Sequence, residues 1–172
     1  MTDAPAVARP SQLWKSLTPE RKLRAAEAFW VDEEAALEQA EAVALIAQRI
    51  KFRAKSVLTM PVDKKARHLA SFPAVSELVA ARLLVAYHLA NQRPMMGSFL
   101  DALGIAHDNG MIADDEVKAP PPETLTSAAA AIASQYPAED VALYLSTLLW
   151  QDPETWGALV DAPERVPATA QS

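Results

Sequence analysis

The stretch AVSELVAARLLVAYHLA, residues 74–90, decides the fold of this chain. It follows Pro73, and alanine and leucine, which form helices well, dominate it. Its acidic and basic side chains are Glu77, Arg82 and His88. Apolar residues occur on nearly every side of a helix with this sequence, a pattern typical of a helix that other helices surround. The sequence therefore predicts a central apolar helix from residues 71–73 to Ala90.

The flanking sequence shows the same helical periodicity, with prolines between the periodic segments. Thr18-Pro19 predicts a helix start, because threonine caps helices and proline suits their first turn. The next segment, residues 32–58, predicts one helix about 40 Å long that spans the domain. Shorter helices are expected at 61–70, 95–103, 123–135, 137–151 and 153–160. The predicted fold class is all-α, an irregular bundle of about eight helices.

The distribution of turn-forming residues predicts a single helical domain over residues 12–161. Residues 105–122 contain Asn109-Gly110 and three successive prolines, so we expect a hinge or linker there. Residues 1–11 and 162–172 are rich in proline, alanine and threonine, and we expect them to be flexible tails.

Composition excludes several classes of function. The 172 residues are 51% hydrophobic and 22% charged, as in globular proteins. The chain has no cysteine, which excludes disulfides, iron–sulfur clusters and thiol nucleophiles. No signal peptide is recognised at the start, and no run of about 20 apolar residues occurs. We therefore expect a cytoplasmic protein that has no membrane partner.

The charges are distributed unevenly. The net charge is −6, yet residues 1–100 hold 14 basic and 10 acidic side chains, whereas residues 101–172 hold 2 basic and 12 acidic ones. Seven bases form a belt that has a single acid, Asp63, among them: Arg49, Lys51, Arg53, Lys55, Lys64, Lys65 and Arg67.

This basic belt has two interpretations. It is either a binding site for an anionic ligand, or a solvated helix end that the acidic half of the chain neutralises. Two observations argue against a nucleic-acid partner. Only Phe52 and Phe72 provide aromatic rings near the belt, and the sequence pI is about 5.1.

The motif Gly-Ile-Ala-His-Asp-Asn-Gly, residues 104–110, provides the candidate metal site. Its His-Asp-x-Gly portion resembles the signature of the His-Asp (HD) metal-dependent phosphohydrolases, an all-helical family. The resemblance implies that Mn or Fe activates a water for phosphate-ester hydrolysis. The implied ligands are His107, Asp108, an upstream histidine (His68 or His88) and a downstream aspartate (Asp140 or Asp152). The alternative interpretation is a polar turn capped by Asp108 or Asn109.

Three further groups of residues have structural interpretations. Arg82 in the apolar helix is expected to pair with a carboxylate of the acidic half, because an unpaired buried charge is very unfavourable. Glu34, Glu38 and Glu41 share one helix face, which we interpret as solvated. The four tryptophans, Trp14, Trp30, Trp150 and Trp156, are expected to pin helix ends to the core.

Taken together, the sequence favours a non-enzymatic, cytoplasmic interaction or regulatory module that binds a protein partner through a helical face. No set of nucleophile, base and oxyanion donors can be assembled from the motifs, and no cofactor is expected. The main alternative is the metal-dependent phosphohydrolase, and the weaker one is anionic-ligand binding at the basic belt.

Overall fold

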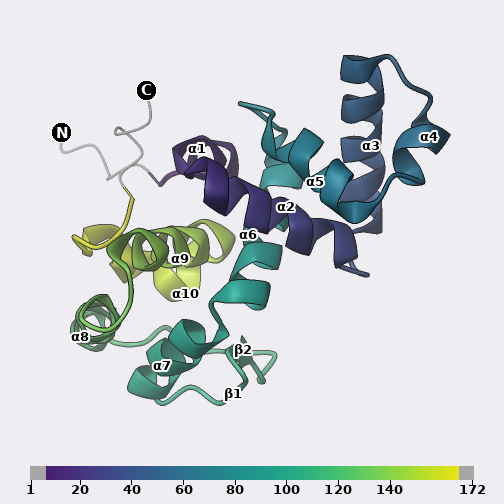
Figure 1. The fold of residues 1–172 in the computed structure, drawn as a ribbon. Coiled ribbons are helices and arrows are strands. Elements are labelled where there is room, and N and C mark those ends of the chain that lie inside the picture. The colour runs from purple at the N-terminus through teal and green to yellow at the C-terminus, as the bar shows by residue number, and fades with distance from the viewer. Residues whose placement is uncertain (1–6, 167–172) are drawn as a thin grey trace. The chain divides into compact units, whose positions relative to one another are not determined.

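The computed structural model describes residues 7–166. Helix accounts for 69% of the described residues, which confirms the predicted all-α class. The described residues contain ten α-helices, one 3-10 helix and one two-stranded hairpin, joined by loops (Figure 1). The prediction of about eight helices missed two short ones, residues 10–16 and residues 54–58.

The chain forms two compact units. One consists of residues 10–90, and the other consists of residues 91–166 together with residues 7–9. The segment 105–122, predicted as a hinge, lies inside the second unit. The expectation of a single domain over 12–161 stays a prediction.

The first unit contains six helices: α1 (Pro10–Ser16), α2 (Pro19–Val31), α3 (Ala36–Ile50), α4 (Ala54–Leu58), α5 (Val62–Ala70) and α6 (Glu77–Asn91), whose last residue lies beyond the unit's boundary. α2 begins where Thr18-Pro19 predicted, and the Thr18 hydroxyl accepts a hydrogen bond from the Arg21 N–H at 3.3 Å. The core of this unit comprises large side chains with no exposed surface, among them Trp14, Phe29, Ile46, Leu69 and Leu83.

The prediction of one helix over residues 32–58 is wrong, because the helix ends before Lys51. This residue has φ 58° and ψ 38°, the left-handed conformation that ends a helix. The Phe52 N–H then donates to the Ala47 carbonyl at 3.0 Å, which closes the helix end. α3 is therefore about 22 Å long, and no helix spans the domain over residues 32–58.

The central apolar helix starts later than predicted. Ser76 caps α6, since its hydroxyl accepts from the Val79 N–H at 3.3 Å and its carbonyl accepts from Ala80 at 2.9 Å. Seven of its fifteen residues are buried: Val79, Ala80, Leu83, Leu84, Ala86, Tyr87 and His88. This burial agrees with the predicted surrounded helix.

The second unit contains α7 (Arg93–Leu103), β1 (His107–Asp108), β2 (Met111–Ile112), α8 (Pro122–Ala133), α9 (Ala138–Gln151), α10 (Pro153–Trp156) and the 3-10 helix η1 (Gly157–Asp161). Phe99 is fully buried in its core. The ring of Phe99 meets that of Tyr144 edge-on at 5.6 Å and that of Trp156 at 6.0 Å. Burial raises the pKa of the Tyr144 phenol well above its usual range.

The hairpin lies within residues 105–122, the segment predicted as a hinge or linker. Asn109 has φ 48° and Gly110 has φ 89°, and two successive positive values are the requirement of a type I′ turn. β1 and β2 pair antiparallel on either side of this turn. The predicted Asn-Gly turn is therefore confirmed, whereas its two short strands were not anticipated.

Parts of the predicted tails are ordered and packed. α1 begins at Pro10, and the Ser11 N–H donates to the Glu77 carboxylate at 3.1 Å. At the other end Ala162 is buried, and the Val166 N–H donates to the Ser146 hydroxyl at 2.8 Å. The expectation of flexible tails stays a prediction. Its remaining positions, 1–6 and 167–172, lie outside the described residues.

Candidate functional site

Lys65 of the predicted basic belt belongs to the core of the first unit. It lies on the buried face of α5 and is only 9% exposed. Its ammonium donates to the Leu58 carbonyl at 3.3 Å and lies 4.8 Å from the centre of the Trp30 ring. A cation over an aromatic face is stabilised by the ring quadrupole. Lys65 therefore packs α5 against α2 and is not available to a ligand.

Two arginines of the belt are also engaged. Arg49 donates to the Ser71 hydroxyl at 3.0 Å, and its guanidinium lies 4.6 Å from the centre of the Phe72 ring. Arg67 forms an exposed i,i+4 ion pair with Asp63 at 3.0 Å. An exposed pair of this kind contributes little to stability. Both arginines have partners within their own unit.

The remaining four cations are exposed: Lys51, Arg53, Lys55 and Lys64. Within residues 7–166, none of these four side chains makes a hydrogen bond or an ion pair. Lys51, Arg53 and Lys55 share this segment with two large apolar side chains that are also exposed, Phe52 at 55% and Leu58 at 60%. We call these five residues of segment 51–58 the basic–apolar surface. It extends from the end of α3 through α4.

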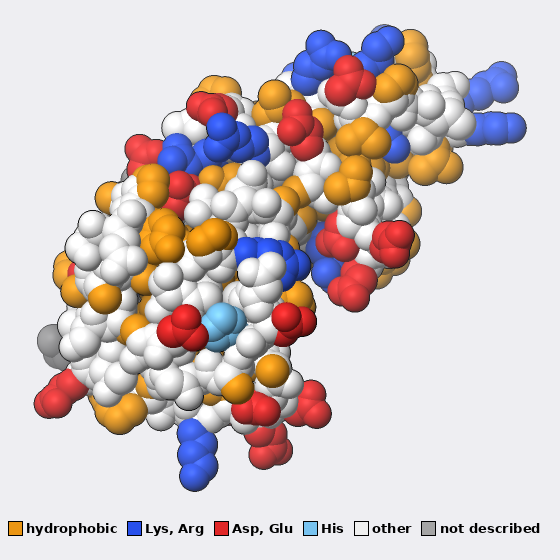
Figure 2. Space-filling view, turned by 60° about the horizontal axis from the view of Figure 1, so that its bottom comes forward, with side chains coloured by type: hydrophobic (Ala, Val, Ile, Leu, Met, Phe, Trp, Pro, Cys, Tyr) orange, Lys and Arg blue, Asp and Glu red, His pale blue; other side chains and the backbone are white. Residues whose placement is uncertain are grey.

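The local fold explains why these side chains face solvent. The left-handed turn at Lys51 reverses the direction of the chain, and α4 is only five residues long. Such a short helix buries a single side chain, Val57. Figure 2 shows Lys and Arg side chains projecting beside apolar ones at the upper right, on the side of the view where Figure 1 places α3 and α4.

This combination of residues is suited to recognition. Phe52 and Leu58 present apolar area that a partner could remove from water, and three neighbouring cations give the same area a positive potential. Aromatic residues are enriched at protein interfaces. Sequence reasoning selected the cations but not Phe52 and Leu58 as surface residues, because helical periodicity across 32–58 hid the break that exposes them.

The geometry of His107 differs from that of a metal ligand. Its Nδ1 accepts the Gly110 N–H at 3.0 Å, and its Nε2 lies 2.7 Å from the Asp101 carboxylate. Because Nδ1 is an acceptor, the neutral ring carries its proton on Nε2 and donates it to Asp101. Both ring nitrogens are therefore engaged, Nε2 in holding the hairpin against α7 and Nδ1 in fixing the turn of the hairpin.

The other implied ligands do not join His107. Successive strand residues point to opposite faces, so Asp108 faces away from His107 and is exposed. His68 lies on α5, His88 is buried on α6, and Asp140 is buried on α9. Within residues 7–166 no group of three His, Asp or Glu side chains could hold a metal ion. The predicted metal-ligand set is therefore not assembled in the described chain.

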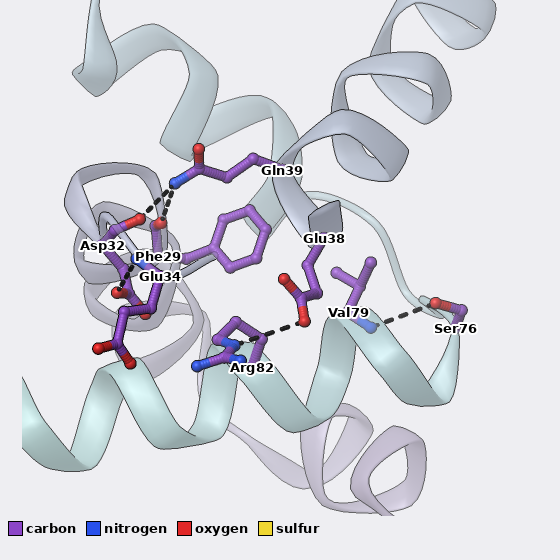
Figure 3. A network of polar contacts seen from close by, with 8 residues as sticks. All are labelled: Phe29, Asp32, Glu34, Glu38, Gln39, Ser76, Val79 and Arg82. Carbon is purple, nitrogen blue, oxygen red and sulfur yellow. Dashed lines mark hydrogen bonds and ion pairs between the residues drawn. The ribbon is translucent and has the colours of Figure 1, made fainter. Parts of the chain in front are cut away.

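Figure 3 shows a polar network that joins α3 to α6 and to the α2–α3 turn. Arg82 lies 3.5 Å from the Glu38 carboxylate, so its partner comes from the N-terminal half and not from the acidic half. Glu38 is 7% exposed, which corrects the interpretation of its helix face as solvated. Gln39 donates to the carbonyls of Phe29 and Asp32 at 2.9 Å each, and so fixes the turn.

Three of the four tryptophans are buried as expected. Trp14 is fully buried and donates from its indole nitrogen to the Phe72 carbonyl at 3.1 Å. Trp30 and Trp156 are also buried, whereas Trp150 is 37% exposed. Trp150 therefore lies at the edge of the second unit's core.

Within residues 7–166, none of the helices is both long enough and apolar enough to cross a bilayer. No protein-family model matches the chain, and neither a curated protein nor a solved structure matches it. The candidate site therefore depends on the geometry and chemistry of the residues described above.

Proposed function

We propose that this chain is a non-enzymatic, cytoplasmic helical interaction module that binds an acidic protein segment at its basic–apolar surface. One observation carries the proposal. Lys51, Arg53 and Lys55 have no side-chain partner within residues 7–166, and they stand next to the exposed Phe52 and Leu58. A partner with carboxylates and apolar side chains would satisfy both halves of this surface.

A protein segment fits this surface better than a nucleic acid or a small anion. Phe52 is the single aromatic ring of the basic–apolar surface, whereas single-stranded nucleic acids are bound on several stacking rings. A phosphate alone would leave Phe52 and Leu58 exposed to water. Recognition of a helix or an extended segment on a helical face needs no catalytic residues and no cofactor.

The metal-dependent phosphohydrolase has less support. Both nitrogens of His107 already have hydrogen-bond partners, and Asp108 faces the other side of its strand. Metal binding there would require those hydrogen bonds to break. We therefore retain the interaction module as the proposed function.

The proposal is tested with a helical peptide of glutamate and leucine as the probe. The triple variant Lys51→Ala/Arg53→Ala/Lys55→Ala should weaken binding at least about tenfold relative to the wild type. A matched control, Lys15→Ala/Arg24→Ala/Lys118→Ala, removes the same charge from other exposed positions and should change the affinity less than about threefold. Binding should also weaken with added salt, because exposed charges are screened.

Two results would contradict the proposed function. One is the absence of binding at peptide concentrations up to about 1 mM, a weak affinity by protein standards. The other is an equal loss of affinity in the control variant, since this would mean that net charge and not the basic–apolar surface attracts the peptide.

A further inference from the structure

A second exposed apolar surface, of opposite charge, lies in the same unit. At the α2–α3 turn Val31 is 67% exposed and Leu37 is 72% exposed. Glu33 and Glu34 between them are exposed, and within residues 7–166 their side chains make no hydrogen bond or ion pair. We call Val31, Glu33, Glu34 and Leu37 the acidic–apolar surface.

This surface is held in a defined shape. The Asp32 carboxylate accepts a hydrogen bond from the Glu34 N–H at 3.0 Å. The Gln39 side chain donates hydrogen bonds to the carbonyls of Phe29 and Asp32. Figure 3 shows Glu34 directed away from Gln39 and Phe29. The acidic–apolar surface is thus built on a fixed turn, which lowers the entropy that a partner's binding would cost.

α3 connects the two surfaces. The acidic–apolar surface lies at its first turn, and the basic–apolar surface begins at Lys51, directly after its last residue and about 22 Å away. Within α3 the residues Leu37, Ala44 and Gln48 are exposed, and their spacings of seven and four place them on one face of the helix. The acidic–apolar surface lies at one end of this face and the basic–apolar surface lies at the other. Ala44, a small residue, lies near the middle.

We infer that the partner of this chain is a second copy of itself, bound with the two α3 helices antiparallel. This inference rests on the proposed function and identifies the acidic segment that it requires. In the antiparallel arrangement Glu33 and Glu34 of each copy meet the cations of the other, so that the charge contact is made twice. A parallel arrangement would place like charges together.

The apolar side chains support the same arrangement. Leu37 lies in the first turn of α3 and Phe52 lies two residues beyond its end, so in an antiparallel pair Leu37 of each copy would lie near Phe52 of the other, and both would leave water. Ala44 near the midpoint allows the two helices to approach. The pairing is symmetric and closed, which yields dimers and not open chains.

The experiment uses two full-length charge-reversal variants. Lys51→Glu/Lys55→Glu makes both surfaces acidic, and Glu33→Lys/Glu34→Lys makes both surfaces basic. All four side chains are exposed, so both variants should keep the wild-type helical spectrum and melting temperature within about 2 °C. Sedimentation velocity over a wide concentration range reports the association of each variant alone and of their equimolar mixture.

We expect the wild type to form a dimer that high salt weakens. For each variant alone, the dissociation constant of the dimer should be at least about tenfold larger. The equimolar mixture should restore association as a heterodimer, because both contacts regain opposite charges. The control Lys15→Glu/Lys118→Glu should dimerise as the wild type does. A wild type that stays monomeric at its highest concentration would overturn the inference, and so would a mixture that fails to associate.

A parallel titration with the glutamate–leucine peptide separates this inference from the proposed function. If the wild type is monomeric yet binds the peptide, and Lys51→Glu/Lys55→Glu abolishes that binding, the self-association fails and the proposed function stands. If neither association nor peptide binding occurs, both fail. If the wild type dimerises but charge reversal has no effect, the dimer uses another surface and the inference is wrong.

Discussion

Single hydrogen bonds decide what His107 can do. Next to Asp108 and Gly110 it forms a motif typical of a metal ligand, and the sequence contains nothing that shows where its ring nitrogens point. In the structure the Gly110 N–H donates to Nδ1, and Nε2 donates to Asp101. The ring also packs so closely on Gly97 that a Cβ there would lie 3.2 Å from His107 Cε1. Short-range geometry of this kind is set by the tertiary fold, which is why the motif alone was misleading.

We predict that excess Mn²⁺ leaves the thermal stability of the metal-stripped protein unchanged. A site filled at about 100 times its dissociation constant would add about 2.7 kcal/mol, or roughly 5–10 °C for a domain of this size. We expect a change of less than about 1 °C, because His107 is already engaged on both nitrogens. A large shift in the wild type that His107→Ala abolishes would contradict this and would favour the phosphohydrolase.

A second residue-scale prediction concerns the ion pair of Glu38 and Arg82. The Glu38 side chain is 9% exposed, so Arg82→Met would leave a buried carboxylate without its cation. We expect the free energy of unfolding to fall by about 2–3 kcal/mol, the lower end for a broken buried pair because Arg82 is 29% exposed.

The double variant Glu38→Gln/Arg82→Met serves as the control. It removes the unpaired charge and should recover more than half of the lost stability in a urea titration. An equal loss in the single and the double variant would mean that the pair acts through packing and not through charge.

At the scale of elements, sequence reasoning succeeded where a side chain makes the helix boundary. The Thr18 hydroxyl caps α2, which begins at Pro19 as the sequence predicted. Sequence reasoning failed at Lys51, where a residue with no preference for the left-handed conformation ends α3. The same failure concealed the candidate site, because α4 and its exposed apolar residues exist only where α3 stops.

We predict that Lys51→Gly stabilises the protein by about 0.5 kcal/mol. Glycine removes a left-handed penalty of about 1–2 kcal/mol, and its greater freedom in the unfolded chain offsets part of that gain. Lys51→Ala removes the charge but keeps the Cβ, so it should be neutral or slightly destabilising. Urea midpoints of the three proteins check this order, and a glycine variant less stable than the alanine variant would contradict the assigned backbone conformation.

The cap of α10 predicts a dependence of stability on pH. Hydrogen bonds from Thr155 lower the pKa of Asp152 below its ordinary value. A folded-state pKa that is lowered means that the capping carboxylate contributes its full stability at pH values above the unfolded pKa. This contribution is lost as the pH falls through the folded value. Asp152→Asn keeps a capping side chain without a titrating group.

The wild type should therefore lose stability relative to Asp152→Asn as the pH is lowered from about 6 to about 3, which brackets the ordinary carboxyl pKa. Paired urea titrations at the two pH values measure this difference. A difference between the two proteins that stays constant with pH would show that the Asp152 carboxylate is not the titrating group.

At the scale of the whole molecule, the two compact units have no local signal in the sequence. Asn109-Gly110 and the three prolines predict a hinge within residues 105–122, yet this segment lies inside the second unit. Compact units are defined by which side chains share a core, and this depends on contacts between residues distant in the chain. Trp14, Phe29 and Leu83 are all fully buried within residues 10–90, yet no local pattern connects them.

We predict that residues 7–91 fold on their own. This fragment contains the entire 10–90 unit, including the Glu38–Arg82 pair and the hydrogen bond from Trp14 to Phe72. A chain of this length can fold without disulfides or metals. It should show a helical circular-dichroism spectrum and a cooperative thermal transition. The fragment 7–76 lacks α6 and with it buried Val79 and Leu83, so it should show no such transition. If 7–91 melts without cooperativity, the first unit depends on the rest of the chain, and its two charged surfaces must then be studied only in the full-length protein.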